Sequence, residues 1–356
     1  MPWGVLSLVC CICGFGLVVL YSAAGGSLRP WALSQGVRFC AFLVGALILS
    51  RIRVDMLKGL AVPAYALLVA MLVGVEALGA VAGGSRRWLD LGIIRLQPSE
   101  LMKPVIVLVL AWFYDMLPAA EIRRWSAIWP AALLVGVPFL LVMAQPDLGT
   151  SLMIVFGGIT VMFLAGIPVR LFVGGIAALV ALTPVALGLL HDYQRSRIEI
   201  FLNPESDPLG TGYHIIQSKI AIGSGGITGK GFLAGTQSHL DYLPEGHTDF
   251  VFATMAEEWG LAGGTFLIVA FLLVIRWGVN VGVRAEDRFA KLAAAGLATT
   301  IFFYMAINLM MVMGLAPVVG IPLPLVSFGG SAQMTVLISI GILIGIDRST
   351  QQRQRW

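Results

Sequence analysis

The chain has 356 residues, of which 58% are hydrophobic and only 12% are charged. A soluble domain is nearer to half apolar and about a quarter charged, so this composition excludes a water-soluble globular protein. In a membrane protein the net charge of +4 mainly reflects how lysine and arginine are distributed between the two sides of the membrane. We therefore expect no nucleic-acid partner.

Apolar runs of about the length that crosses a bilayer, roughly 20 residues, follow one another along almost the whole chain. They predict an all-α polytopic membrane protein with about ten transmembrane helices. They leave no room for a separate soluble domain, so we expect a single membrane domain over residues 1–356. The expected helices cover 4–22, 33–50, 57–76, 99–115, 127–144, 149–166, 169–190, 250–276, 288–313 and 325–346.

The basic residues predict the orientation of these helices. With an even number of spans both termini lie on one side, and cytoplasmic segments carry the excess of lysine and arginine. Short outer segments would hold five such residues, Arg29, Arg86, Arg87, Arg95 and Lys103. If both termini lie in the cytoplasm, the cytoplasmic segments hold thirteen lysine and arginine residues, so we expect this orientation. They are Arg51, Arg53, Lys58, Arg123, Arg124, Arg170, Arg276, Arg284, Arg288, Lys291, Arg348, Arg353 and Arg355.

Two outer segments, 77–98 and 191–249, are too long to be simple connections. The second is a long extracytoplasmic loop between the seventh and eighth helices, and it holds all four histidines of the chain. Long loops on a rigid scaffold commonly carry function. We therefore expect the chemistry on the outer face.

The ionisable residues inside the expected spans support the same face. Six of them fall in the outer half of the bilayer, where a transporter would instead need polar groups along a path to both faces. Snorkelling of long side chains at helix ends is the alternative for any one of them. The residues are Arg38, Glu76, Glu100, Lys103, Glu257 and Glu258.

Residues 86–103 read RRWLDLGIIRLQPSELMK. Glu100 and Lys103 are three residues apart after a proline helix start, so they share a helix face and could position a charged head group. An ordinary ion pair at a helix end is the alternative. Arg87 is a candidate to bind phosphate, and Trp88 is a natural anchor at the membrane interface.

Residues 223–231 read GSGGITGKG, which resembles a phosphate-binding loop. The full pattern would need glycine in place of Ser224 and a hydroxyl residue in place of Gly231. The backbone amides of such a turn can still bind a pyrophosphate. A plain flexible loop is the alternative.

Residues 239–249 read HLDYLPEGHTD and end directly before an apolar span. A carboxylate at that position, Asp249, is partly desolvated, which makes it a better general base. The two His-x-Asp pairs, with Glu245 between them, could also bind a divalent cation, Mg²⁺ or Mn²⁺ rather than Zn²⁺. The alternative is a solvated acidic loop with an N-cap aspartate. Further along, residues 314–333 combine three prolines with four glycines, so this irregular segment must pack on protein or line a cavity.

Four ordered segments resemble one known family. They are RRWLDLG with QPSELMK, QPDLGTS at 145–151, GKGFLAGTQSHLDYLPEGHTDFVFATMAEEWG at 229–260, and NLMMVMGLAPVVGIPLPLVSFGGS at 308–331. On these motifs the chain is identified as a member of the SEDS family (shape, elongation, division, sporulation) over essentially its full length. GTQSHLDYLPE and PVVGIPLPLVSFGG are more similar to the elongation members than to the division members. Ala332 departs from the usual serine, and Phe328 from a common tyrosine.

The resemblance implies a peptidoglycan glycosyltransferase that polymerises lipid II into glycan strands on the outer face of the cytoplasmic membrane during cell elongation. It implies an obligate class B penicillin-binding protein, the transpeptidase that cross-links the strands, and it places the family's essential aspartate on Asp249. The donor is α-linked and the product β-linked, so one base and one inverting displacement suffice. Candidate substrate-binding residues are Arg87, Trp88, Glu100, Lys103, Arg197, Lys219, His247 and Ser327, helped by a divalent cation.

Two other functions fit the same helices. A lipid II flippase would use a similar lipid cavity but needs no carboxylate base and should carry polar groups on both faces. A non-catalytic scaffold for the transpeptidase would tolerate changes at Asp249. The outer bias of the ionisable residues favours the enzyme.

Overall fold

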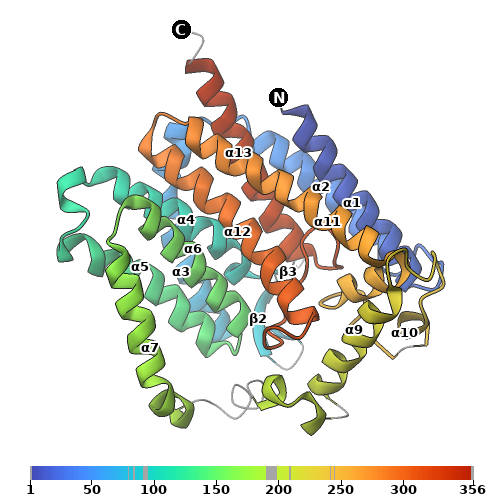
Figure 1. The fold of residues 1–356 in the computed structure, drawn as a ribbon. Helices are drawn as coiled ribbons and strands as arrows, with labels where there is room; N and C mark the ends of the chain where they lie inside the picture. Colours follow the sequence, from blue (N-terminus) through green and yellow to red (C-terminus); the bar gives the residue numbers. More distant parts are fainter. Residues whose placement is uncertain are drawn as a thin grey trace.

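The computed structural model describes residues 2–78, 80–82, 85–90, 95–189, 199–207, 210–240, 242–243 and 245–353. Long helices form a bundle with both chain ends at one end, and α9 and α10 lie at the other (Figure 1). The expected all-α polytopic fold is confirmed. Its long helices are α1 (Trp3–Ala23), α2 (Ala32–Leu49), α3 (Val54–Leu78), α4 (Pro98–Met116), α5 (Trp125–Ala144), α6 (Leu148–Ala165), α7 (Val169–Leu189), α11 (Val251–Arg284), α12 (Arg288–Val312) and α13 (Gly330–Arg353).

Eight helices of the described chain are long and apolar enough to cross a membrane, as judged by length and composition. The other two expected spans are also helical. α4 carries Glu100, Lys103 and Asp115 but is largely buried among other helices, and α7 contributes the shorter apolar stretch Val169–Leu182. All ten expected helices are therefore present.

Three helix boundaries differ from the expected ones by more than three residues. α11 continues to Arg284 rather than ending near 276, and α13 continues to Arg353 rather than ending near 346, because a helix can run on past the point where its apolar stretch stops. α13 begins at Gly330 rather than near 325, because the backbone of Leu325 has a positive φ of 68° and a turn closes at Ser327. Residues 314–329 are thus irregular.

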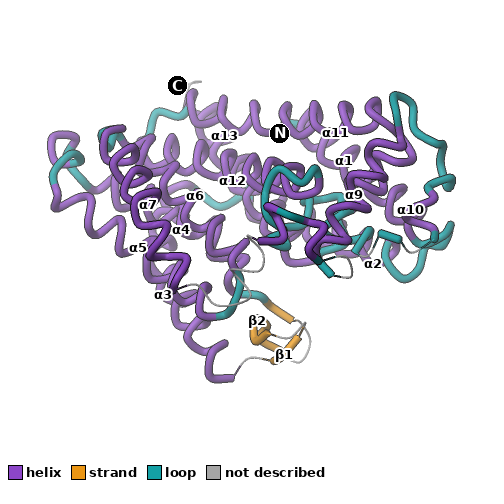
Figure 2. Tube along the Cα trace, turned by 60° about the horizontal axis from the view of Figure 1, so that its bottom comes forward, coloured by secondary structure: helices purple, strands orange, loops and turns teal. Residues whose placement is uncertain are grey.

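Both long outer segments contain structure that the sequence did not reveal. After α3 comes a small antiparallel sheet of β1 (Ala80–Ala82), β2 (Ser85–Asp90) and β3 (Arg95–Leu96), in that order. It projects from the bundle beyond the end of α3 (Figure 2). The second segment holds the 3-10 helix η2 (Pro204–Ser206), α9 (Thr211–Gly225) and α10 (Thr236–His239). A further 3-10 helix, η1 (Ala119–Glu121), links α4 to α5.

Small residues let the central helices approach closely. A Cβ added at Gly158 on α6 would lie 2.5 Å from Val135 on α5, and one at Gly296 on α12 would lie 2.6 Å from Val107 on α4. Close packing of this kind is what holds helices together in lipid, where hydrophobic burial offers little between them. The result is a rigid frame beneath the outer segments.

Candidate functional site

Asp249 lies two residues before α11 begins and is half-buried. Its backbone is fixed by Asn308, a fully buried residue of α12. The Asn308 side-chain amide donates to the Asp249 carbonyl at 2.9 Å and to the Ile321 carbonyl at 2.8 Å. One amide group therefore ties the start of α11 to the irregular segment before α13.

That irregular segment, 314–329, forms the wall beside Asp249. Gly320 has a φ of +69°, and a Cβ added there would lie 3.5 Å from the Asp249 carboxylate. The Val319 carbonyl packs so closely on Gly149, at the start of α6, that an added Cβ would lie 2.5 Å from it. The segment is packed on protein, as irregular backbone near a membrane must be.

Ser327 holds this segment in shape from within. Its hydroxyl accepts from the Leu323 amide at 2.8 Å, while its own amide donates to the Leu323 carbonyl at 2.8 Å. The side chain is 2% exposed. Gln35, buried on α2, donates to the Ser327 carbonyl at 2.8 Å. The expected substrate-binding role of Ser327 is therefore replaced by a structural one, because its polar atoms are used and covered.

His247 lies two residues before Asp249 and is packed against aromatic side chains. Its ring stacks on Trp31 with 4.0 Å between centroids and 10° between planes. Its carbonyl accepts from the Phe328 amide at 2.9 Å, and the Arg38 guanidinium lies 5.1 Å from the Phe328 ring centroid. Burial lowers the pKa of His247, and nearby Glu245 partly opposes the shift. The imidazole is accordingly neutral near pH 7.

Glu100 and Lys103 lie inside the bundle, away from any surface that a head group could reach. The Lys103 ammonium is 2.5 Å from Glu100 Oε1 and donates to the Tyr304 hydroxyl at 2.8 Å. That hydroxyl donates to Glu100 Oε2 at 2.5 Å. Lys103 is 1% exposed and Glu100 5%. They share a helix face as expected, but they form a closed buried triad with Tyr304, so we assign them a structural role in place of substrate binding.

The glycine-rich residues 223–231 supply hydrogen-bond partners at a break in α11. Gly260, with φ 61° and ψ −159°, interrupts the helix. The carbonyls of Glu257 and Glu258, which would otherwise pair within the helix, accept instead from the amides of Lys230 and Gly231 at 3.0 and 3.1 Å. In return, the amides of Leu261 and Ala262 donate to the carbonyls of Gly226 and Ile227 at 2.9 and 3.0 Å.

These four bonds satisfy four of the backbone groups that the break exposes. They also use the amides of Lys230 and Gly231, which are then not available to a pyrophosphate, and they hold the segment against α11. Gly229 is required sterically, because an added Cβ would lie 2.0 Å from the Glu258 carbonyl.

Glu257 anchors the same segment from below. It is fully buried and accepts from the Lys230 ammonium at 2.6 Å and from the amides of Thr236 and Gln237, at the start of α10. Glu258 accepts from the Ser22 hydroxyl on α1. The acidic pair therefore fastens the outer segment and α1 to α11.

Arg87 and Trp88 lie on β2, and both are partly exposed. Arg87 donates to the carbonyls of Gln145 and Pro146 at 3.1 and 2.5 Å, which attaches the small sheet to the turn between α5 and α6. The same turn holds Asp147, whose carboxylate caps α6 through the Thr150 amide at 3.1 Å. Arg87 is thus partly committed to the fold, at the outer end of the bundle.

Lys219 is exposed on α9, and its side chain lies over Gly314 at the beginning of the irregular segment. α9 is fixed to α12 because the Ser218 hydroxyl donates to the Val312 carbonyl at 2.7 Å. Lys219 is accordingly a fixed cation beside the irregular segment. Arg197, the other cation expected in this loop, lies outside the described residues.

The part of the chain that the structure describes contains no group of three His, Cys, Asp or Glu side chains able to hold a metal ion. Asp241 lies outside it, and so does the side chain of His239. The described members of the motif do not form a ligand set, since His247 stacks on Trp31 and Glu245 accepts from the Thr248 hydroxyl. The divalent cation stays a prediction.

The arrangement can support base chemistry at one position. The irregular wall lies beside the Asp249 carboxylate and the neutral imidazole of His247 is two residues away in the sequence, while the buried carboxylates Glu100 and Glu257 hold lysine and hydrogen-bond partners. The sequence did not single out Trp31 or Gln35, since an aromatic or amide residue at a helix start has no pattern that announces a long-range contact. Asn308 is a polar residue within a span, which is a signal that a sequence does offer.

The comparisons with known proteins agree with this picture. Residues 4–352 match a family model for FtsW, RodA and SpoVE, described as cell cycle proteins. The chain is 44% identical over 333 residues to the peptidoglycan glycosyltransferase MrdB of Escherichia coli K12, covering 93% of this chain and 89% of that one. It is 38% identical to the stage V sporulation protein E of Bacillus subtilis, covering 78% and 75%.

Solved structures show the same fold. One, from work on the structural coordination of polymerization and crosslinking by a peptidoglycan synthase complex, has a TM-score of 0.86 and 32% identity, and covers 99% of this chain and 98% of that one. Another is the crystal structure of the rod shape determining protein RodA of Thermus thermophilus. It has a TM-score of 0.74 and 29% identity, and covers 98% and 96%.

Proposed function

Because the chain belongs to the FtsW/RodA/SpoVE family of cell cycle proteins, we propose that it is a peptidoglycan glycosyltransferase that polymerises lipid II during cell elongation. The observation that carries the proposal is Asp249, a half-exposed carboxylate at the mouth of α11 on a backbone fixed by buried Asn308. The name of the relative from Escherichia coli, which is 44% identical, supports the activity.

Asp249 acts as the general base. Its carboxylate takes the proton from the 4-hydroxyl of the acceptor sugar as the oxygen attacks the anomeric carbon of the donor. The bond from that carbon to the lipid pyrophosphate breaks, and the pyrophosphate leaves with both electrons. A single displacement inverts an α-linked donor into a β-linked product, and it needs no second carboxylate as nucleophile.

Cations near Asp249 offset the charge that grows on the leaving pyrophosphate. Lys219, exposed on α9 over the irregular segment, and Arg87, partly exposed on β2, are the described candidates. Trp88, beside Arg87, and the His247–Trp31 stack offer flat apolar surfaces to the sugar or the lipid. A divalent cation would add Lewis-acid stabilisation when bound.

The protein works in the cytoplasmic membrane with its termini in the cytoplasm and Asp249 outside. Both chain ends lie at the end of the bundle opposite α9 and α10 (Figure 1), and the lysine and arginine distribution puts that end in the cytoplasm. Its partner is a class B penicillin-binding protein, which is consistent with the similarity to a component of a peptidoglycan synthase complex.

Glycan formation from purified lipid II tests the proposal. The reconstituted protein is assayed with its transpeptidase partner and divalent metal present, as wild type and as Asp249→Asn. The variant keeps the shape but not the basicity, so we expect it to lose at least about a hundredfold in rate, while Asp55→Asn, an exposed carboxylate at the other end of the bundle, retains activity.

Polymer from the Asp249→Asn variant at the wild-type rate would overturn the assignment of the base. Absence of polymer from the wild type itself would favour the other two functions. A flippase would then move lipid II across vesicles without polymerising it, and a scaffold would do neither yet still raise the activity of the transpeptidase.

A further inference from the structure

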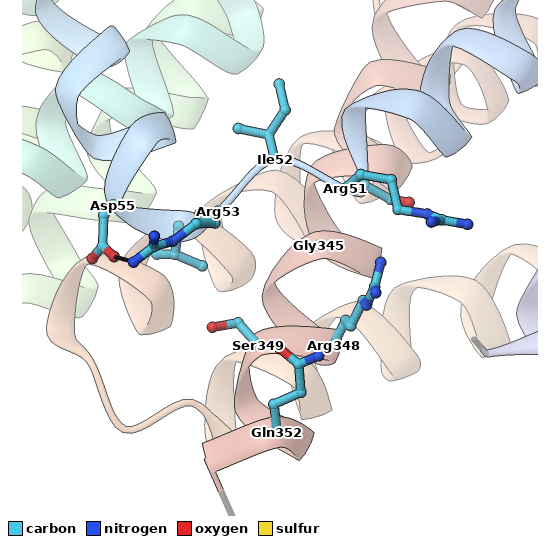
Figure 3. Close-up of a pocket in the computed structure, with 10 residues that line it drawn as sticks. Arg51, Ile52, Arg53, Asp55, Gly345, Arg348, Ser349 and Gln352 are labelled. Carbon is cyan, nitrogen blue, oxygen red and sulfur yellow. Dashed lines mark hydrogen bonds and ion pairs between the residues drawn. The ribbon is translucent and has the colours of Figure 1, made fainter.

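A basic cavity lies at the end of the bundle opposite Asp249. Trp31, at the start of α2, stacks on His247 near Asp249, and α2 then runs 18 residues, about 27 Å, to the turn that joins it to α3. This turn and the end of α13 enclose a cavity of about 560 Å³. Figure 3 shows the side chains that line it.

Two arginines from distant parts of the sequence meet at this cavity. The Arg348 side chain, on α13, extends toward Arg51 in the turn, and both residues are exposed (Figure 3). In the described chain, neither guanidinium has a carboxylate within ion-pair distance. The cavity's own carboxylate, Asp55, is paired with a third arginine, Arg53, at 3.2 Å. Like charges that converge without a counter-ion form a site for an anion.

Neutral hydrogen-bond donors complete the lining. The Gln352 amide lies beside Arg348, and the Ser349 hydroxyl extends to the other side of α13 (Figure 3). Val54 and Asp55, the first two residues of α3, also line the cavity, and the amides of a first helical turn have no acceptor within their helix. Guanidinium, hydroxyl and amide donors around one gap suit the oxygens of a phosphate group.

An apolar track leads along α2 into this site. Val37, Val44 and Ile48 are 63%, 57% and 66% exposed, and their spacing of seven and four residues puts them on one face of the helix. Arg51 follows three residues after Ile48. A molecule with an acyl chain on this face and a phosphate in the cavity would satisfy both surfaces, whereas a free phosphate ion would use only one.

We propose that this cavity binds the phosphate head group of an anionic phospholipid in the leaflet opposite Asp249, with an acyl chain along α2. Basic pockets between membrane helices bind such head groups. Arg51 and Arg348 hold the phosphate oxygens, and because these residues sit on α13 and on the α2–α3 turn, the lipid joins the two. The site takes no part in the glycosyl transfer proposed above.

The test measures lipid binding to the full-length protein in detergent, by native mass spectrometry with phosphatidylglycerol and phosphatidylcholine as probes. Arg51→Gln/Arg348→Gln is compared with Arg123→Gln/Arg124→Gln. The control removes the same charge from two exposed arginines between η1 and α5, at the same end of the bundle. We expect the cavity variant to bind phosphatidylglycerol about thirtyfold more weakly and the control to stay within about twofold.

A second variant, Ser349→Glu, leaves both arginines in place and puts a carboxylate in the cavity, so it should weaken binding in a protein that unfolds at the wild-type temperature. Asp249→Asn should bind as the wild type does, which separates this proposal from the proposed function. Equal weakening in the two double variants, no preference over phosphatidylcholine, or displacement by an equal concentration of inorganic phosphate would each overturn it.

Discussion

Two carboxylates near the start of α11, Glu257 and Asp249, are eight residues apart and have opposite environments. Glu257 is fully buried and holds the Lys230 ammonium and two backbone amides. Asp249 is partly exposed at the mouth of α11, and Asn308 donates to its backbone carbonyl. A charge buried with its partners supports the fold, whereas a charge at a mouth on a fixed backbone is available for chemistry.

Glu100 belongs with Glu257 in this comparison. Both its oxygens have partners, Lys103 and Tyr304, and the group lies where substrate cannot reach. A sequence shows only that such residues lie inside a span, and both kinds of carboxylate satisfy that description. Variants can therefore distinguish the two kinds of carboxylate: replacing a structural one should mainly lower stability, and replacing a catalytic one should mainly lower activity.

The largest expected effect on stability is at Lys103. Lys103→Met leaves the buried Glu100 without its ammonium, which should lower the free energy of unfolding by about 3–5 kcal/mol. Asp249→Asn should change it by no more than about 0.5 kcal/mol, since the side chain is half-exposed. Thermal unfolding in detergent measures both. Equal losses of stability in the two variants would contradict the distinction between a structural Glu100 and a chemically available Asp249. The double variant Lys103→Met/Glu100→Gln should recover part of the stability lost in Lys103→Met.

Gly229→Ala should have the next largest effect on stability. Its φ is +81°, and its new Cβ would lie 2.0 Å from the Glu258 carbonyl, so the segment must lift off the break in α11. We expect a loss of more than about 2 kcal/mol. Gly226→Ala is the matched control, because its φ is +56° but an added Cβ meets nothing within 4 Å. A similar loss in both variants would mean that backbone strain alone, and not the contact, decides the cost.

Asn308→Ala should affect both stability and activity. It strips the donor from the Asp249 and Ile321 carbonyls, which costs about 1–3 kcal/mol, and it frees the backbone that positions the base. The rate constant kcat should therefore fall more than KM rises. Thr300→Ala, on the same helix, is the control, since its hydroxyl bonds only to the Gly296 carbonyl within α12. A KM effect alone would place Asn308 outside the positioning of Asp249.

The smallest effect concerns His247. Because burial lowers its pKa in the folded state, the unfolded chain binds its proton first as the pH falls through about 6.5. The stability supplied by the neutral ring is complete above that pH and declines below it, by less than about 1 kcal/mol per pH unit. His247→Phe should keep the stack on Trp31 and flatten this slope. Identical unfolding profiles between pH 5 and 7 would contradict the assignment.

Most of the fold could be predicted from the sequence because apolar length is a strong signal in membranes. All ten helices were expected, and the discrepancies lie where apolar length says nothing. The sheet around Arg87, helix α9 around Lys219 and the late start of α13 depend on turns and long-range contacts. The break at Gly260 was hidden for the same reason, since one glycine within an apolar run predicts no partner segment.

Less of the candidate site could be predicted. Asp249 stood out because a carboxylate at the mouth of a span is partly desolvated and because the family resemblance places an essential aspartate there. Lys103 and Ser327 have the residue types of a binding site, yet they are buried by contacts with Tyr304 and Leu323 that lie outside their own motifs. Burial is a property of the assembled bundle, and spacing alone carries no information about it.

The repaired break in α11 has a consequence for how this protein can change. Four backbone bonds link residues 226–231 to 257–262 in a fixed register, so a single residue inserted into the glycine-rich segment would misalign them all. We expect epitope tags, deletions and evolutionary length variation to be excluded from this stretch, although it looks like a loop in the sequence. Any lineage that loses Gly260 should lose the glycines facing it as well.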